Sequence, residues 1–496
     1  MEGIMYQQKL PAGPASGPGW RVLLAALGLG IAWLLQGCGG GGGGVADVGA
    51  DPGSGEVLVT LTDAEGDFVT YTVDITSLRL EHANGTLVET LPQTTRLDFA
   101  QYVDLTELLT AAQVPNGRYV GGSITLDYSN ADIQVEVGGV AVPATVVDQA
   151  GQPLSSYTLE LRLDEGRPLV VAPGLPALLN IDFDLAASHE VDTSAPVPTA
   201  TASPFLLADI EPVDEKELRA RGPLRAVNID DMYYAIRLRP WHHRVGDYGR
   251  AKIHVRDDTE FEVNGETWLG ADGLRALEAA GVGTPTVALG ILDVSERKFT
   301  ASRVLAGDSV PGERFDAVFG NVTARNGNVL TVRGATVVPR AGSVIFNDDV
   351  EITVSDDTVV RKPGEPGVNQ GIGAVSVGQR VVVLGEVTSN PALPGLTMDA
   401  TQGRIRMRYT QLFGLANSVV PGQINIDLRS IDRRRIALFD FSGTGMTPDV
   451  DADPTDYEVT TATLDTSFVV PQTPVQVAGF VRPFGEAPPD FEGRTV

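Results

Sequence analysis

Apolar and polar residues alternate with a two-residue period through most of the chain after residue 55, which is the pattern of β-strands with one buried face. Segment Glu56–Thr62 alternates, and Tyr71–Ile75 alternates again before the phase shifts at Leu78 and Leu80, which predicts a β-bulge. The pair Asn84-Gly85 predicts a hairpin turn. Further short strands are expected at 118–120, 123–126, 133–137, 158–161 and 179–184.

One segment of this first region departs from the two-residue period. Leu105–Ala112 (LTELLTAA) is rich in leucine and alanine, and we predict a short helix there. The strands around it have the spacing of a β-sandwich, which we place at residues 55–210. Segment Asp192–Pro204 is rich in proline, serine and threonine and predicts a loop or linker near the end of that domain.

The rest of the chain repeats itself with a period of about 95 residues. VRDDT at 255–259 matches VSDDT at 354–358, and TVALG at 286–290 matches VVVLG at 381–385. A period of this length suits a small domain and is too long for a solenoid repeat. We therefore expect three units, at 219–310, 311–408 and 409–496.

The first unit has the clearest order of predicted elements. It reads as strands at 224–238, 251–255 and 259–263, a helix at 272–280, and strands at 286–292 and 298–304. This β-β-β-α-β-β order is that of the OB-fold, a five-stranded, partly open barrel. The other two units lack a clear helix at the corresponding place. The predicted fold class is mainly β, with an N-terminal β-sandwich followed by three small OB-like β-barrels.

The N-terminal segment predicts export. Val22–Leu35 is almost wholly apolar but shorter than the ~20 residues that cross a membrane, and Lys9 and Arg21 precede it. Leu35-Gln36-Gly37-Cys38 resembles the bacterial lipobox. The resemblance implies that residues 1–37 are a cleaved signal peptide and that Cys38 carries the acyl chains.

The residues around Cys38 extend this prediction. Cys38 is the only cysteine, which excludes an intramolecular disulfide and a cysteine-cluster metal site. Residues 38–54 are glycine-rich and predict a flexible tether. By resemblance to the sorting rule of Gram-negative lipoproteins, Gly39 favours the outer membrane. The expected location is the bacterial cell envelope, with the lipid on Cys38 holding the protein to the membrane.

Several motifs resemble known but uncharacterised domains. LTDAEGDF at 61–68, VPNGRY at 114–119 and NIDFDLAASHEV at 180–191 resemble a domain of bacterial lipoproteins, although Glu65 stands where that family usually has proline. The resemblance implies an exported β-sandwich with no established activity. The repeats, with their D-D-T and V-x-V-x-G strands, resemble a small β-barrel domain of exported bacterial proteins.

Charge narrows the classes of partner. The formal net charge is −27 and the pI is near 4.5, which disfavours nucleic-acid binding. Basic and aromatic residues nevertheless gather in the first unit, where OB-type barrels bind oligosaccharides. We take these as candidate ligand-binding residues: Arg237, Arg239, Trp241, His242, His243, Tyr248, Arg250 and Lys252. The alternative is an ordinary exposed or inter-domain surface. Residues 433–435, a run of three arginines, are a weaker candidate without aromatic partners.

Two acidic stretches are candidate calcium sites, because hard cations prefer oxygen ligands. One is the turn with Asp63 and Asp67, and the other is the loop with Asp449, Asp451, Asp453 and Asp456. The second is not an EF-hand, because a proline follows Asp453 where glycine is required. The alternative for both is a solvated turn whose carboxylates bind local backbone amides. We expect no other cofactor.

Catalytic motifs are scarce: the chain has no G-x-S-x-G, H-E-x-x-H or P-loop, and only five histidines. We therefore predict a protein that is not an enzyme, and that binds a polysaccharide or another envelope protein or serves as a structural module. The alternative is a glycan-active hydrolase with paired carboxylates in an inter-domain cleft.

Overall fold

The structure is a computed structural model, and it describes residues 53–62, 68–102, 105–137, 140–163, 168–174, 176–183, 185–202, 207–209, 217–239, 245–293, 298–341, 345–389, 395–462 and 464–496. The predicted signal peptide, Cys38 and the predicted tether up to residue 52 lie outside these ranges, whereas Ser54, the last residue of the predicted tether, begins strand β1 (Ser54–Thr62). The described residues form one unit within Asp47–Val496. None of their helices has the length and apolar character needed to cross a membrane.

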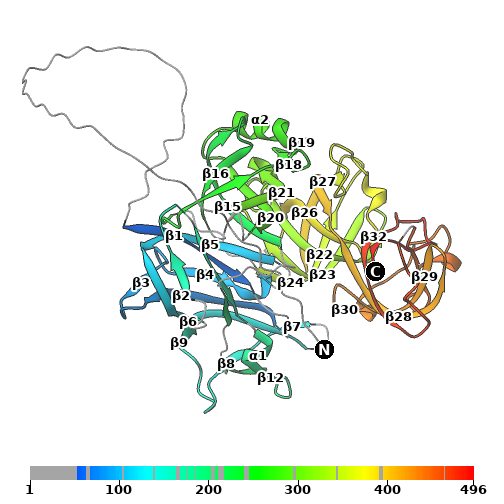
Figure 1. The fold of residues 1–496 in the computed structure, drawn as a ribbon. Helices are drawn as coiled ribbons and strands as arrows, with labels where there is room; N and C mark the ends of the chain where they lie inside the picture. Colours follow the sequence, from blue (N-terminus) through cyan, green and yellow to red (C-terminus); the bar gives the residue numbers. More distant parts are fainter. Residues whose placement is uncertain are drawn as a thin grey trace, which may run out of the picture. The chain divides into compact units, whose positions relative to one another are not determined.

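The first domain is built from two main sheets, as the alternating pattern predicts (Figure 1). One sheet has seven strands: β2 (Phe68–His82), β3 (Leu87–Glu89), β4 (Thr95–Asp98), β6 (Gly117–Val137), β7 (Val140–Pro143), β9 (Ser156–Arg162) and β10 (Leu169–Val171). The other contains β1 (Ser54–Thr62), β5 (Leu105–Pro115), β11 (Ala177–Asp182) and β14 (Leu207–Asp209). Side chains of both sheets belong to the same hydrophobic core.

Smaller elements complete the first domain. They are β8 (Thr145–Val147), β12 (His189–Asp192), β13 (Thr199–Ala202), the short helix α1 (Leu185–Ser188) and the 3₁₀ turn η1 (Phe99–Tyr102). β13 pairs with both β12 and β8, so the segment predicted as a linker contains a paired strand. The predicted bulge in β2 is confirmed by register shifts around Ile75, and the predicted hairpin is confirmed by the β2–β3 pairing with Gly85 at a φ of 84°.

The helix predicted at Leu105–Ala112 is wrong, because this segment is strand β5. β5 pairs antiparallel with β1 and parallel with the first strand of the next domain, so its backbone is hydrogen-bonded on both sides. Its two faces are both buried, which explains the continuous apolar run that resembles a helix. Tertiary pairing therefore overrides the helix propensity of leucine and alanine.

The first barrel follows the OB order but not with the strands that the sequence predicts. The predicted long strand 224–238 is a hairpin of β15 (Glu217–Asn228) and β16 (Tyr233–Arg237). The barrel closes as β15–β16–β17–β21–β20–β15, with β17 (Arg250–His254) parallel to β21 (Lys298–Ala306). The remaining elements are β18 (Glu260–Val263), β19 (Glu266–Leu269), α2 (Gly270–Ala280), β20 (Pro285–Asp293) and η2 (Gly307–Ser309).

The second and third barrels close in the same order. The second contains β22 (Asp316–Asn326), β23 (Val329–Val338), β24 (Ile345–Thr353), β25 (Val359–Arg361), η3 (Ile372–Ala374), β26 (Arg380–Val387) and β27 (Leu396–Met407). The third contains β28 (Thr410–Val420), β29 (Gln423–Ile431), β30 (Arg434–Arg435), η4 (Ile436–Leu438), η5 (Pro448–Val450), β31 (Tyr457–Thr460), β32 (Pro474–Val481) and β33 (Phe491–Thr495). In both, the third and fifth barrel strands pair in parallel. The predicted fold class is therefore confirmed.

The first domain and the first barrel share one sheet. β15 pairs with β5 through Glu217–Leu105, Leu218–Thr106 and Arg219–Glu107, which joins the two into an eleven-stranded sheet. A single hydrophobic core runs through both. The second and third barrels have separate main cores of their own.

Candidate anion-binding pockets of the first barrel

The structure separates the ligand-binding residues predicted in the first barrel. Trp241, His242 and His243 lie outside the described residues. Tyr248 is fully buried, and its hydroxyl is 3.0 Å from the Thr95 hydroxyl of the first domain. The prediction that Tyr248 contacts a ligand is therefore wrong, because its ring packs in the core and anchors the loop before β17.

Arg237 and Arg239 line a pocket of about 390 Å³ beside the β15–β16 hairpin. Its wall includes four arginines and one carboxylate among the described residues: Arg221, Arg225, Arg237, Arg239 and Glu313. Apolar side chains, including Leu224, Val287 and Val310, complete it. The pocket draws on β15, β16, β20 and the turn after η2, so distant parts of the sequence build it.

The arginines of this pocket differ in their partners. Arg237 Nε is buried and, among the described residues, has no hydrogen-bond partner. Arg239 donates to the Leu238 carbonyl over 2.9 Å, and its pKa is lowered by burial and then by Arg237. Guanidinium groups that are close together and incompletely paired are suited to bind carboxylate or phosphate, because these groups supply acceptor oxygens for the free N–H donors.

Arg250 and Lys252 line a different pocket, of about 430 Å³, where the first barrel meets β1 and β5. His254 and Lys298 add to its basic wall, and Glu56 lies on the side of the first domain. Burial, Lys298 and Lys252 lower the pKa of His254 to about 4, so this imidazole is neutral at pH 7. Lys252 Nζ lies 3.8 Å from the centre of the Tyr233 ring, a cation–π contact that holds the lysine over the strand.

One lining residue of the first pocket, Arg221, belongs to a buried ion triad. Glu107 of β5 is fully buried and forms ion pairs with Arg219 and, over 2.8 Å, with Arg221, both on β15. The triad cannot be recognised from the sequence, where Glu107 lies in a segment predicted to be a helix. Strand pairing of Glu107 with Arg219 is what brings the carboxylate to the two arginines.

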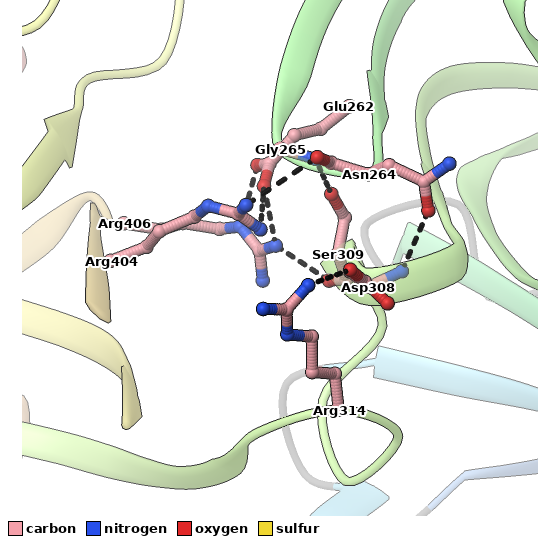
Figure 2. A network of polar contacts seen from close by, with 8 residues as sticks. All are labelled: Glu262, Asn264, Gly265, Asp308, Ser309, Arg314, Arg404 and Arg406. Carbon is pink, nitrogen blue, oxygen red and sulfur yellow. Dashed lines mark hydrogen bonds and ion pairs between the residues drawn. The ribbon is translucent and has the colours of Figure 1, made fainter. Parts of the chain in front are cut away.

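A second buried ion pair joins the first and second barrels (Figure 2). Arg406 of β27 donates to both oxygens of Glu262 of β18, over 2.7 and 2.8 Å, and also to the Ser309 carbonyl. The Ser309 hydroxyl in turn accepts from the Gly265 backbone over 2.8 Å. The side chains of Glu262 and Arg406 are each less than a tenth exposed. This contact holds the two barrels at a defined point.

The predicted calcium sites gain no support. Asp63 and Asp67 lie outside the described residues. Asp451 accepts the Gly445 backbone amide, Asp453 accepts the backbone and hydroxyl of Thr455, and Asp456 accepts from asparagine side chains. Asp449 lies exposed in η5. No group of three metal-ligating side chains is found in the part of the chain that the structure describes.

The comparisons with known proteins concern the first domain. No curated protein matches the chain, and no solved structure matches it. Residues 54–195 match the model of a family described as a domain of unknown function (DUF4382). The match covers β1 to β12, which agrees with the predicted uncharacterised domain and identifies this part of the chain as similar to that family.

Proposed function

We propose that this protein is a lipid-anchored component of the bacterial cell envelope that binds an acidic glycan through its first barrel. The observation that carries the proposal is the pocket of Arg221, Arg225, Arg237 and Arg239 with Glu313 as the one carboxylate in its described lining. A concentration of positive charge in one pocket of a chain with net charge −27 selects anionic ligands locally.

The pocket suits a sugar acid for two reasons. Arginine forks bind carboxylate or phosphate in pairs of parallel hydrogen bonds. The apolar side chains of Leu224, Val287 and Val310 offer a surface for the carbon face of the ring. The pocket also lies on an OB-ordered barrel, a fold that presents loops and strand faces to oligosaccharides.

Binding tests this proposal directly. We expect the detergent-solubilised protein to bind acidic glycans on an array and to leave the matched neutral glycans unbound. The double variant Arg237→Ala/Arg239→Ala should lose that binding, whereas Arg429→Gln, which removes an exposed arginine of the third barrel, should keep it. Equal binding of acidic and neutral glycans, or unchanged binding by the double variant, would contradict the proposal.

Anchoring is tested separately. Cys38→Ser removes the only thiol and should leave an unprocessed precursor without acyl mass. Mass spectrometry of the mature N-terminal peptide reads the result. A wild-type peptide that carries no acyl group, or that begins before Cys38, would remove the envelope anchor from the proposal while leaving glycan binding to be judged on its own.

The alternative, a glycan hydrolase, needs two carboxylates on either side of the bond that is cleaved. Glu313 is the one carboxylate among the described residues of the proposed pocket, which favours binding over hydrolysis. Release of reducing sugar from a bound acidic glycan would reverse this preference.

A further inference from the structure

A second arginine-rich cavity, of about 340 Å³, lies where the three barrels meet. Its described lining holds eight arginines and two carboxylates, Glu217 and Asp432. Arg303 comes from β21 of the first barrel. In the second barrel, Arg380 begins β26 and Arg408 directly follows β27. Asp432 lies in the turn after β29 of the third. This density of like charge is costly in a poorly solvated site unless anions are near.

The carboxylates around the cavity are already engaged. Asp432 accepts the Gln411 backbone amide over 2.9 Å and the Asn321 side-chain amide, and Glu217 accepts the Ser302 hydroxyl over 2.8 Å. Deeper in the wall, Glu262 is bound by Arg406. These carboxylates are thus already hydrogen-bonded, and the lining holds more arginines than acidic groups.

Within the described part of the chain, Arg408 is the arginine of this lining with the fewest partners of its own. No hydrogen bond or ion pair of its guanidinium is found among the described residues. Burial, followed by Arg303 and Arg380, lowers its pKa to about 10, although Glu217 acts in the opposite direction. Its backbone is fixed, because its amide donates to the Arg380 carbonyl over 2.8 Å and its carbonyl accepts from the Gln379 side chain over 2.6 Å. Nearby, Arg406 Nη1 is buried without a hydrogen-bond partner among the same residues.

We propose that this cavity binds a compact molecule with two or more anionic oxygen groups, phosphoryl or carboxylate, and that Arg408 is its central ligand-binding residue. Its volume lies within the range of small-molecule sites. The apolar side chains of Val287, Leu289, Phe319 and Val382 face the same space and suit a carbon skeleton attached to the anionic groups. This site is distinct from the glycan pocket, although the two linings share Arg221, Val287 and Pro311.

Isothermal titration calorimetry of the full chain with inorganic pyrophosphate and with citrate tests the proposal. We expect one saturable site for at least one probe, and the tighter probe identifies the preferred anionic group. Arg408→Gln should weaken binding about ten- to a hundred-fold, the loss expected for one charge-assisted hydrogen-bonding group. Arg429→Gln, which removes the same charge outside the cavity, should bind like wild type.

Thermal unfolding without ligand separates a binding role from a structural one. Because Arg408 is unpaired among other arginines, Arg408→Gln should leave the midpoint unchanged or raise it, while the pyrophosphate- or citrate-induced rise disappears. Three results would each overturn the proposal: no binding of either probe, unchanged binding by Arg408→Gln, or a lowered midpoint of the unliganded variant. Arg237→Ala/Arg239→Ala should retain this binding, so failure of glycan recognition does not decide it.

Discussion

The Glu262–Arg406 pair gives the sharpest prediction about stability (Figure 2). Glu262→Gln removes the charge while keeping the size of the side chain, and leaves Arg406 buried without its counter-charge. Breaking a buried pair from one side costs about 3–5 kcal/mol. At about 2–4 °C per kcal/mol for a domain of this size, the midpoint of the transition that contains the first two barrels should fall by roughly 6–20 °C.

Scanning calorimetry of the full chain measures this shift. Asp308→Asn is the matched control, because Asp308 pairs over 2.7 Å with Arg314, whose side chain is 63% exposed, and should cost less than about 1 kcal/mol. Glu262→Gln combined with Arg406→Met removes both charges and should recover part of the loss. Equal shifts for Glu262→Gln and Asp308→Asn would refute the reasoning that burial makes this pair important.

The contribution of the same pair to stability depends on pH, because it requires Glu262 to be ionised. Burial alone would raise the pKa of Glu262, but Arg406, with Ser309 and Arg404, lowers it to about 2. Because the folded pKa lies below the ordinary value of 4.5, the contribution is complete above pH 4.5 and is lost as the pH falls toward 2. The loss is about 3 kcal/mol, and Glu262→Gln should lack this part of the acid sensitivity.

Three further predictions concern the first domain and its contact with the first barrel. Burial lowers the pKa of His189 to about 4, so its contribution to stability should be complete above pH 6.5 and be lost between pH 6.5 and 4. Between pH 7 and 5, the free energy of unfolding measured in denaturant titrations should fall by about 2 kcal/mol more in wild type than in His189→Phe. Tyr248→Phe should cost about 1 kcal/mol through the lost Thr95 contact, which a thermal midpoint equal to wild type would contradict. Gly249→Ala should destabilise the protein by more than about 1 kcal/mol, because Gly249 has a φ of 91° and an added Cβ would lie 2.0 Å from the Ala111 carbonyl oxygen. An unchanged unfolding midpoint in calorimetry would contradict this and show that the loop can move.

The candidate pockets show how far residue types alone can lead. Arg237 and Arg239 were recognisable from the sequence as basic residues on an OB-type barrel, and they do line a pocket. Tyr248 has the same aromatic character but is core, because a residue type does not tell which way a loop turns. Arg408, the residue that we propose binds a ligand in the second cavity, follows a strand and belongs to no sequence motif, so only the meeting of the barrels reveals it.

Local chemistry determined the class of fold. Alternation at a two-residue period, the Asn84-Gly85 turn and the short amphipathic segment at 272–280 each depend on neighbours in the sequence, and each is present in the structure. The repeat at about 95 residues likewise follows from comparing the chain with itself, and the three barrels close in one common strand order.

Pairing between distant strands decided the rest. Leu105–Ala112 has the residues of a helix but lies in a strand, because β1 and β15 pair with its backbone on both sides. Glu107 is tolerated in the core because the same pairing brings Arg219 and Arg221 to it. Arg219 and Arg221 lie more than a hundred residues from Glu107, and β1 is also remote from β5 in the sequence, so their effect on conformation and charge exists only once the sheet has formed.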